Sequence, residues 1–272
     1  MKHFESRNQD SIVTINDTDR CLYLKHKITL RGLAPHPRIG TTPSNNQGIV
    51  YDIQHTQHGD IYNAFVYIPI QNRQDDEQYV YAMSANVPMK NISLEESRNK
   101  NVISPNGKWV NYLRIMFVTD SIENMRNIAD AMELYVFSDK MPTTEKYGME
   151  IYDKNGNITY NSNLVIMRLA LVIHKTYPDT FLTKDEYELG NIPFQGIKKP
   201  GLSVTYPLAV ISSGDSYMHH EVEWTGGGIN ITTTYKGVAG GAIRPNSIKT
   251  TQILICELDG TQDIPAIGPT AI

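Results

Sequence analysis

Short strand-like runs, separated by turn-forming residues, follow one another along most of the chain. These runs are rich in Val, Ile, Tyr and Phe and are bounded by Gly, Pro, Asn and Asp, which is typical of β-strands. They occupy residues 59–69, 78–83, 108–118, 132–137, 163–175, 201–206, 208–211, 228–235 and 250–256. Helical periodicity is scarce: only residues 121–131 predict a short helix or turn, with Ser121 and Asn124 as a weak capping signal. We therefore expect an all-β fold, with loops at 34–47, 92–107 and 177–200.

The stretch YGMEIYDKNGNITYNSN, residues 147–163, predicts a β-hairpin. Its Asn155-Gly156 pair lies between alternating apolar residues and favours a type I′ turn, because both central residues of that turn need positive φ. Shifting the chain by 145 positions places residues 3–24 over 148–169. Glu5, Thr14, Asn16 and Leu24 then meet identical residues. Either the two halves are duplicated, or β-rich stretches coincide by chance.

The repeat predicts two tandem β-sandwich domains, which are possible duplicates of one another. Both halves open with a hairpin and a long strand, and both close with an apolar strand that ends in Asp, at 133–139 and 252–259. We expect a first domain at 1–143 and a second at 144–259, with a linker at 138–147. Residues 260–272 carry two prolines and no strand pattern. We expect them to form an extended C-terminal arm that lies on another subunit.

Composition excludes several classes of protein. The 272 residues are 40% hydrophobic and 20% charged, which suffices for a packed core. The net charge of −4 and the absence of a long basic run argue against a nucleic-acid partner. Residues 1–6 carry charge where a signal peptide would be apolar, and runs such as 169–173 are too short to cross a membrane. We expect a soluble protein whose Cys21 and Cys256 are buried thiols, with a disulfide between them as the alternative.

Two histidine clusters are the candidate metal sites. His55, His58 and Asp60 have ligand-type side chains within six residues, but we favour a solvated loop before a strand as their explanation. Further along, His219, Glu221 and Glu223 would share one face of a strand. A polar outer face opposite an inner face of Val222 and Trp224 is the simpler interpretation, which we favour.

The other motifs also have simple structural interpretations. The glycines at 226–228 lack the Lys-Ser/Thr of a phosphate loop, and those at 237–242 suit a turn between strands. The serines at 212–216 lack the pattern of a nucleophile elbow. Asp75, Asp76 and Glu77 are expected to be solvated. We therefore predict no catalytic, cofactor-binding or metal-binding residues and a non-enzymatic protein, with a β-fold hydrolase kept only because of the histidines.

Tyrosine is unusually frequent, with 16 residues against six phenylalanines. Because tyrosine has an apolar body and a polar tip, it suits surfaces that become buried on association. It is equally common in half-exposed strands. The bias therefore leaves interface use and strand propensity open.

The second hairpin carries a resemblance. Its Gly148, Asp153, Gly156, Tyr160 and Asn161-Ser162 resemble the opening of a loosely defined family of structural proteins of tailed bacteriophages. The resemblance covers residues 148–259 and implies a virion component, tail-associated or capsid-associated, without catalytic residues. The N-terminal copy lacks both glycines.

That resemblance implies a set of partners and a place. We expect a homo-oligomer that contacts other virion proteins, is made in the host cytoplasm, and is built into the tail or collar. Alternatives are a capsid decoration protein, or a receptor- or carbohydrate-binding module that presents Trp109, Trp224 or tyrosines as stacking platforms. A host surface glycan or receptor is then a further partner.

Overall fold

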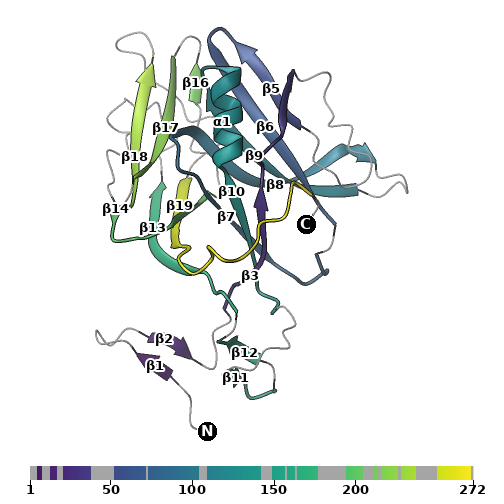
Figure 1. Ribbon diagram of the computed structural model, residues 1–272, viewed down its shortest axis with the longest axis vertical. Coiled ribbons are helices and arrows are strands. Elements are labelled where there is room, and N and C mark those ends of the chain that lie inside the picture. Colours follow the sequence, from purple (N-terminus) through teal and green to yellow (C-terminus); the bar gives the residue numbers. More distant parts are fainter. Residues whose placement is uncertain are drawn as a thin grey trace.

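A computed structural model describes most of the chain (Figure 1). The described residues are 5–7, 13–16, 21–37, 52–71, 73–103, 109–141, 149–156, 158–162, 164–176, 194–204, 211–213, 216–225, 228–236, 250–270 and 272. Strands dominate them, and they contain one α-helix, so the all-β prediction is confirmed. Among these residues, no helix combines the length and the hydropathy of a membrane span.

Two large sheets face each other. The six-stranded sheet has the order β13-β19-β15-β7-β10-β3, and the nine-stranded sheet has the order β14-β18-β17-β8-β9-β6-β5-β4, with β16 paired to β17. The strands of the first sheet are β3 (Tyr23–Thr29), β7 (Tyr79–Ser84), β10 (Glu133–Ser138), β13 (Arg168–Thr176), β15 (Pro200–Val204) and β19 (Thr250–Glu257). Those of the second are β4 (Ala34–Pro37), β5 (Asp52–His58), β6 (Ile61–Ile70), β8 (Met89–Ile103), β9 (Trp109–Thr119), β14 (Phe194–Gln195), β16 (Ile211–Ser213), β17 (Ser216–Thr225) and β18 (Gly228–Lys236).

Two hairpins lie outside these sheets, at the same end of the molecule (Figure 1). They are β1 (Glu5–Arg7) with β2 (Val13–Asn16), and β11 (Glu150–Tyr152) with β12 (Ile158–Asn161). Their registers repeat at positions 145 residues apart: Glu5 pairs with Asn16, and Glu150 pairs with Asn161. Both hairpins shift register after their second pair. The aligned segments of the sequence therefore form the same local structure.

The correspondence continues into the six-stranded sheet. Strand β3 skips Lys25 where it pairs with β10, and β13 skips Ala170, its counterpart 145 positions later, where it pairs with β19. On its other edge β10 pairs with β7, as β19 pairs with β15, and both ladders are antiparallel and without a register shift. The two triplets of strands meet edge to edge, where Leu202 of β15 pairs antiparallel with Met83 of β7. Antiparallel pairing of two like edges has the arrangement of a twofold axis.

Two tandem sandwiches, divided at residues 143 and 144, are not confirmed. Each sheet combines strands from both halves of the chain: β7 pairs with β15 in one sheet, and β8 pairs with β17 in the other. One apolar cluster runs through both halves and includes Ile28, Ile115, Leu202 and Ile255. Each half alone would leave strand edges and apolar surface open, so the halves complete one another.

The helix α1 (Ile122–Ala131) lies against β4 and β9 and is the short helix predicted at 121–131. Ser121 caps it by accepting the backbone N–H of Asn124 at 3.1 Å. Met125, Ile128 and Ala129, at helical spacing, are buried in the common core.

The arm at 260–272 lies on its own chain, and its predicted placement on another subunit is wrong. The N–H of Thr29 donates to Ile267 O at 3.0 Å, and the N–H of Ile267 donates to Lys27 O at 2.9 Å. Ile272 is fully buried and exchanges two backbone hydrogen bonds with Pro69 and Gln71. The arm therefore covers the open edge of β3 and then joins the end of β6 (Figure 1).

Two local predictions are also wrong. Residues 92–103 form most of β8 rather than a loop, because their ladder with β9 places Ile92 and Leu94 in the core. In the second hairpin, the N–H of Gly156 donates to Asp153 O at 3.1 Å. Gly156, with φ of 83°, therefore follows the turn instead of forming its centre with Asn155 as a type I′ turn requires.

Candidate functional site

A polar cleft of about 800 Å³ opens where the two halves meet. Its walls come from the end of β3, the turn after β7, helix α1, the start of β10, the approach to β15, and the end of β17. Junctions between structural units are frequent places for ligand sites, and the volume lies in the range of about 300–1,000 Å³ that such sites have. This cleft is the candidate functional site.

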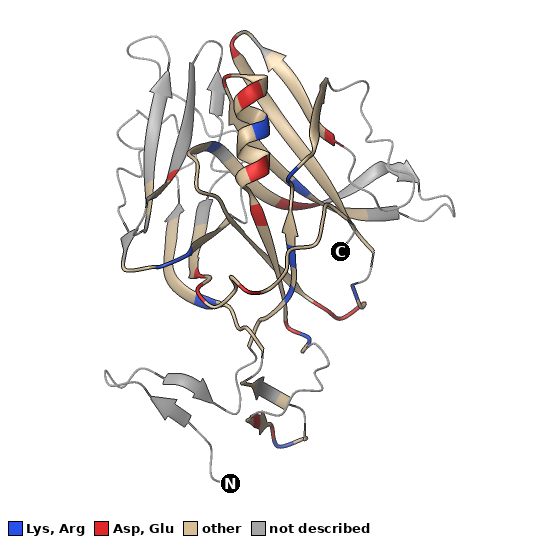
Figure 2. Ribbon diagram, viewed as in Figure 1, with Lys and Arg blue, Asp and Glu red and all other residues tan. Residues whose placement is uncertain are grey.

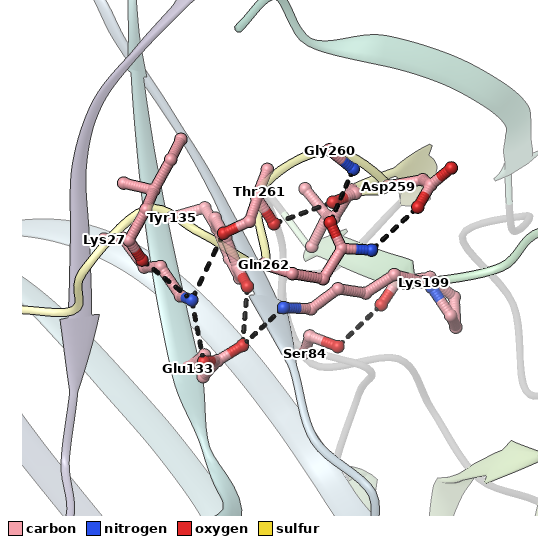
Figure 3. Close-up of polar contacts among 12 residues, drawn as sticks. Lys27, Ser84, Glu133, Tyr135, Lys199, Asp259, Gly260, Thr261 and Gln262 are labelled. Carbon is pink, nitrogen blue, oxygen red and sulfur yellow. Dashed lines mark hydrogen bonds and ion pairs between the residues drawn. The ribbon is translucent and has the colours of Figure 1, made fainter.

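Glu133 lies in the wall of the cleft and receives three hydrogen-bond donors. Lys27 Nζ lies 3.1 Å and Lys199 Nζ 2.8 Å from its carboxylate oxygens, and the Tyr135 hydroxyl donates to it at 2.6 Å. Figure 3 shows the two lysines pointing toward Glu133 from different elements. Two lysines from distant parts of the chain and a tyrosine of the same strand thus converge on one carboxylate.

These donors decide the charge of Glu133. Burial acts to raise its pKa, but the hydrogen bonds from Lys199, Tyr135 and Lys27 outweigh burial and lower the pKa to about 2. The carboxylate therefore stays ionised at any physiological pH. A general base needs a pKa near the working pH, so Glu133 suits an anchoring role.

The same network holds the C-terminal arm. Lys27 Nζ also donates to the backbone oxygens of Thr261, at 3.3 Å, and of Ile264, at 3.2 Å. On the other side of the cleft wall, the Ser84 hydroxyl donates to Pro200 O at 2.8 Å and ties the end of β7 to the start of β15 (Figure 3). The wall of the cleft is therefore fixed by bonds between the two halves and the arm.

Neutral polar groups and carbon surfaces form the rest of the cleft. The exposed side-chain amides of Asn86 and Asn127 line it, as does Trp224. Trp224 is partly buried against the core, and its Nε1 is buried without a hydrogen-bond partner in the described part of the chain. An indole contact with a ligand would therefore be made by ring carbons.

No group of three metal-ligating side chains comes together in the described part of the chain. His55 lies in β5 rather than in a solvated loop, and its ring meets that of Tyr62 edge to face, with centroids 5.5 Å apart. Burial, followed by the nearby His36, lowers the pKa of His55. The side chain of His58 lies outside the described residues.

The second cluster lies on β17, as predicted. Glu223 is exposed and Trp224 packs against the core, which confirms the polar outer face at these two positions. The side chains of His219 and Glu221 lie outside the described residues. That of Trp109, the other predicted stacking platform, is also outside them.

The glycine and serine motifs lie in strand connections. Thr225 pairs with Gly228, so β17 and β18 form a hairpin. Ser212 and Ser213 belong to β16, which pairs antiparallel with β17, whereas a nucleophile elbow joins a strand to a helix. Residues 237–242 lie outside the described part of the chain.

The sequence missed the burial of Glu77. Asp75 and Asp76 are exposed as predicted, but the Glu77 side chain is fully buried and lies 2.6 Å from Lys25 Nζ. Burial acts to raise its pKa, but the hydrogen bonds, first from Lys25 and then from Ser138 and the Gln74 backbone, lower it. Local sequence holds no signal for this, since Lys25 lies 52 positions away.

The cysteines and most of the described tyrosines are structural. Neither cysteine is in a disulfide; Cys21 is half-buried, against the prediction, whereas Cys256 is buried and burial raises its pKa to about 12. The disulfide alternative is thus not realised. Buried tyrosines are Tyr23, Tyr79, Tyr81, Tyr112 and Tyr135. The tyrosine bias, as far as the structure describes it, reflects core strands more than exposed surface.

The signature residues of the second hairpin hold the hairpin itself. Asp153 Oδ1 accepts the N–H of Asn155 at 2.7 Å, and the side chain of Asn161 is buried and donates to Glu150 at 2.9 Å. Ser162 Oγ accepts the N–H of Met149 at 2.9 Å. The motif therefore specifies the local structure of the hairpin. Any function of the hairpin depends on its exposed side chains.

Comparisons of the chain with protein-family models, with curated proteins and with solved structures find no match.

Proposed function

We propose that the chain is a non-enzymatic structural protein of a bacteriophage virion, associated with the tail or collar, that acts through contacts between subunits. We further propose that its halves arose by duplication. The observation that carries the proposal is the second hairpin with its phage-type signature, whose pairing register recurs in the first hairpin. A capsid decoration protein with the same contacts is the alternative place in the particle.

The hairpins are suited to docking. Each forms a separate two-stranded sheet, and an isolated two-stranded sheet is only marginally stable in water. In the second hairpin, Met149 and Tyr152 are 55% and 51% exposed. Contact with a neighbouring subunit would bury these side chains and stabilise the hairpin at the same time.

Charge does not point to one kind of macromolecular partner. Acidic and basic residues are interspersed along the described part of the chain, and α1 carries both signs (Figure 2). Contacts of such a surface depend on shape and apolar burial more than on long-range attraction.

The test is the composition of purified particles. Particles from a lysate that contains the chain are banded in a caesium chloride gradient, and the chain is quantified by mass spectrometry against a host cytosolic protein. We expect a fixed small number of copies per particle, with immunogold label on the tail or collar. The proposal would be contradicted if the chain is abundant in the lysate but is lost from the banded infectious particles to the same extent as the host protein.

A hairpin variant tests the contact. Tyr152→Asp combined with Met149→Asp should reduce incorporation into particles at least tenfold, because it places charge where apolar surface is buried. Lys154→Ala, at the exposed turn of the same hairpin, is the matched control and should be incorporated normally. Equal incorporation of both variants would exclude this hairpin as the docking element.

A further inference from the structure

We infer that the cleft at the junction of the two halves binds a neutral carbohydrate, through the amides of Asn86 and Asn127 and the carbon surface of Trp224. This inference goes beyond the virion proposal and does not depend on it, since a sugar site can serve a protein in or out of a particle.

Three of the five charged residues that line the cleft, Glu133, Lys198 and Lys199, form ion pairs within the protein. Glu133 is paired with Lys27 and Lys199, and Lys198 Nζ lies 3.0 Å from Asp259. The other two, Arg31 and Asp130, are exposed and of opposite sign, and Asp130 accepts the N–H of Gly32 at 2.8 Å. A site for phosphate or nucleotide would concentrate unpaired cations or aligned backbone N–H groups, so this pattern favours an uncharged ligand.

The remaining polar groups suit hydroxyls. Each side-chain amide offers two N–H donors and an oxygen acceptor, so Asn86 and Asn127 can each bind a hydroxyl that both donates and accepts. Asn127 and Asp130 lie one turn apart on α1, and Asn86 follows β7. A ligand with several hydroxyls can therefore bridge the helix and the sheet.

The apolar part of the wall suits the carbon face of a sugar. Trp224, Ala85, Pro200 and Ala266 contribute carbon surface from four separate segments. Because Nε1 of Trp224 is buried, the ring would contact a ligand through carbon and leave orientation to the amides. The amphipathic wall thus fits a ligand with hydroxyl edges and C–H faces.

The wall is also preorganised. The Ser84–Pro200 hydrogen bond and the Glu133 network hold four of its segments without a ligand. The side chains of the wall then lose less conformational entropy when a ligand binds. This matters most for ligands that bind weakly, such as sugars.

The probe is an array of immobilised oligosaccharides that contains neutral, sialylated and sulfated glycans, incubated with the fluorescently labelled full chain. We expect binding to a subset of neutral glycans. The affinity for the best neutral oligosaccharide is then measured by calorimetry. Binding to none of the neutral glycans, or only to anionic ones, would overturn the inference.

Matched variants place the site. Asn127→Ala and Asn86→Ala should each weaken binding about tenfold or more, since a lost amide removes two hydrogen bonds. Arg126→Ala changes the neighbouring exposed residue of α1, outside the cleft, and should leave affinity unchanged. Trp224→Phe keeps an aromatic ring in the core and should weaken binding less than the amide variants. Neutral-glycan binding that survives both asparagine changes would place the site elsewhere and contradict the inference.

The two tests have separate outcomes. Loss of glycan binding in Asn127→Ala with normal incorporation into particles supports both proposals. Glycan binding by a chain that is absent from particles would overturn the virion proposal alone.

Discussion

Glu133 shows how one residue joins three parts of the chain. It lies at the start of β10 and is bonded by Lys27 of β3, by Lys199 ahead of β15, and by Tyr135 of its own strand. Because Lys27 also holds the arm, loss of the carboxylate would leave a buried ammonium with carbonyl partners only. Removing one partner of a buried ion pair leaves the other charge buried and uncompensated. The loss of stability is then larger than the stability that the pair contributes.

Glu133→Gln should therefore lower the free energy of unfolding by about 1–3 kcal/mol at pH 7, with solvent screening limiting the effect because the carboxylate is 30% exposed. The folded-state pKa of about 2 lies below the reference value of 4.5, so the contribution is complete above about pH 5 and is lost as the pH falls through 2. Urea unfolding between pH 3 and 7 measures it, with exposed Glu123→Gln as the control. A wild-type advantage that stays constant down to pH 3 would contradict this account.

Gly201 lies where an added side chain would force its neighbours to shift. A Cβ at this position would lie 2.6 Å from Leu258 Cδ1 and 2.8 Å from Cys256 Sγ. Gly201→Ala should lower the free energy of unfolding by about 1–3 kcal/mol through overpacking. Gly268→Ala is the control, because a Cβ there meets nothing within 4 Å. Equal urea midpoints for the two variants would show that Leu258 and Cys256 are packed loosely enough around Gly201 to accept a methyl group.

Single residues were the hardest level to predict from sequence. The polar–apolar alternation of Glu223 and Trp224 was visible because strand period is local. The burial of Glu77 and the three partners of Glu133 were not, because their partners lie on strands whose pairing the sequence does not state. The cleft has the same origin: Asn86, Asn127 and Trp224 come together only through the sheet order.

Among the elements, the C-terminal arm has the clearest structural role. It adds backbone hydrogen bonds to β3, an edge strand that would otherwise offer unpaired groups to other chains. Its last described residue, Ile272, lies in the common core. The arm therefore protects an edge and closes one side of the sandwich.

Ile272→Ala should lower the free energy of unfolding by about 2–4 kcal/mol, because it removes a fully buried side chain. Ile267→Ala is the matched control in the same arm: its side chain is 41% exposed and its hydrogen bonds come from the backbone, so its effect should stay below about 1 kcal/mol. Thermal unfolding compares the two. A larger effect at Ile267 than at Ile272 would mean that the arm is held differently.

Strands and the helix were predictable where apolar periodicity is strong, as in β6, β9, β10 and α1. Strand β8 was missed because residues 95–103 are almost all polar, and pairing with β9 alone makes them a strand. The arm was misplaced because a segment without periodicity carries no information about which surface it covers. The hairpin at 150–161 was found, but its turn differs because the Asp153 carbonyl and side chain cap the turn one residue earlier.

At the scale of the whole molecule, the repeat was visible in the sequence, but the joining of the two halves into shared sheets was not. The offset of 145 aligns hairpin registers and strand bulges. From sequence, two similar halves suggested two separate sandwiches. In the structure the halves join edge to edge in both sheets and share one core, because each alone lacks strands to cover its apolar face.

The central claim is therefore that the two halves form one cooperative unit. Each half contains one tryptophan, Trp109 in β9 and Trp224 in β17, so the variants Trp224→Phe and Trp109→Phe report on the first and second half separately. Equilibrium urea unfolding of each variant, followed by fluorescence of the remaining tryptophan and by far-ultraviolet circular dichroism, is the most direct test. We predict that the two probes agree within each variant in a single transition. Fluorescence and circular dichroism transitions that separate, with one half unfolding while the other keeps its strands, would show two independent domains and contradict the account.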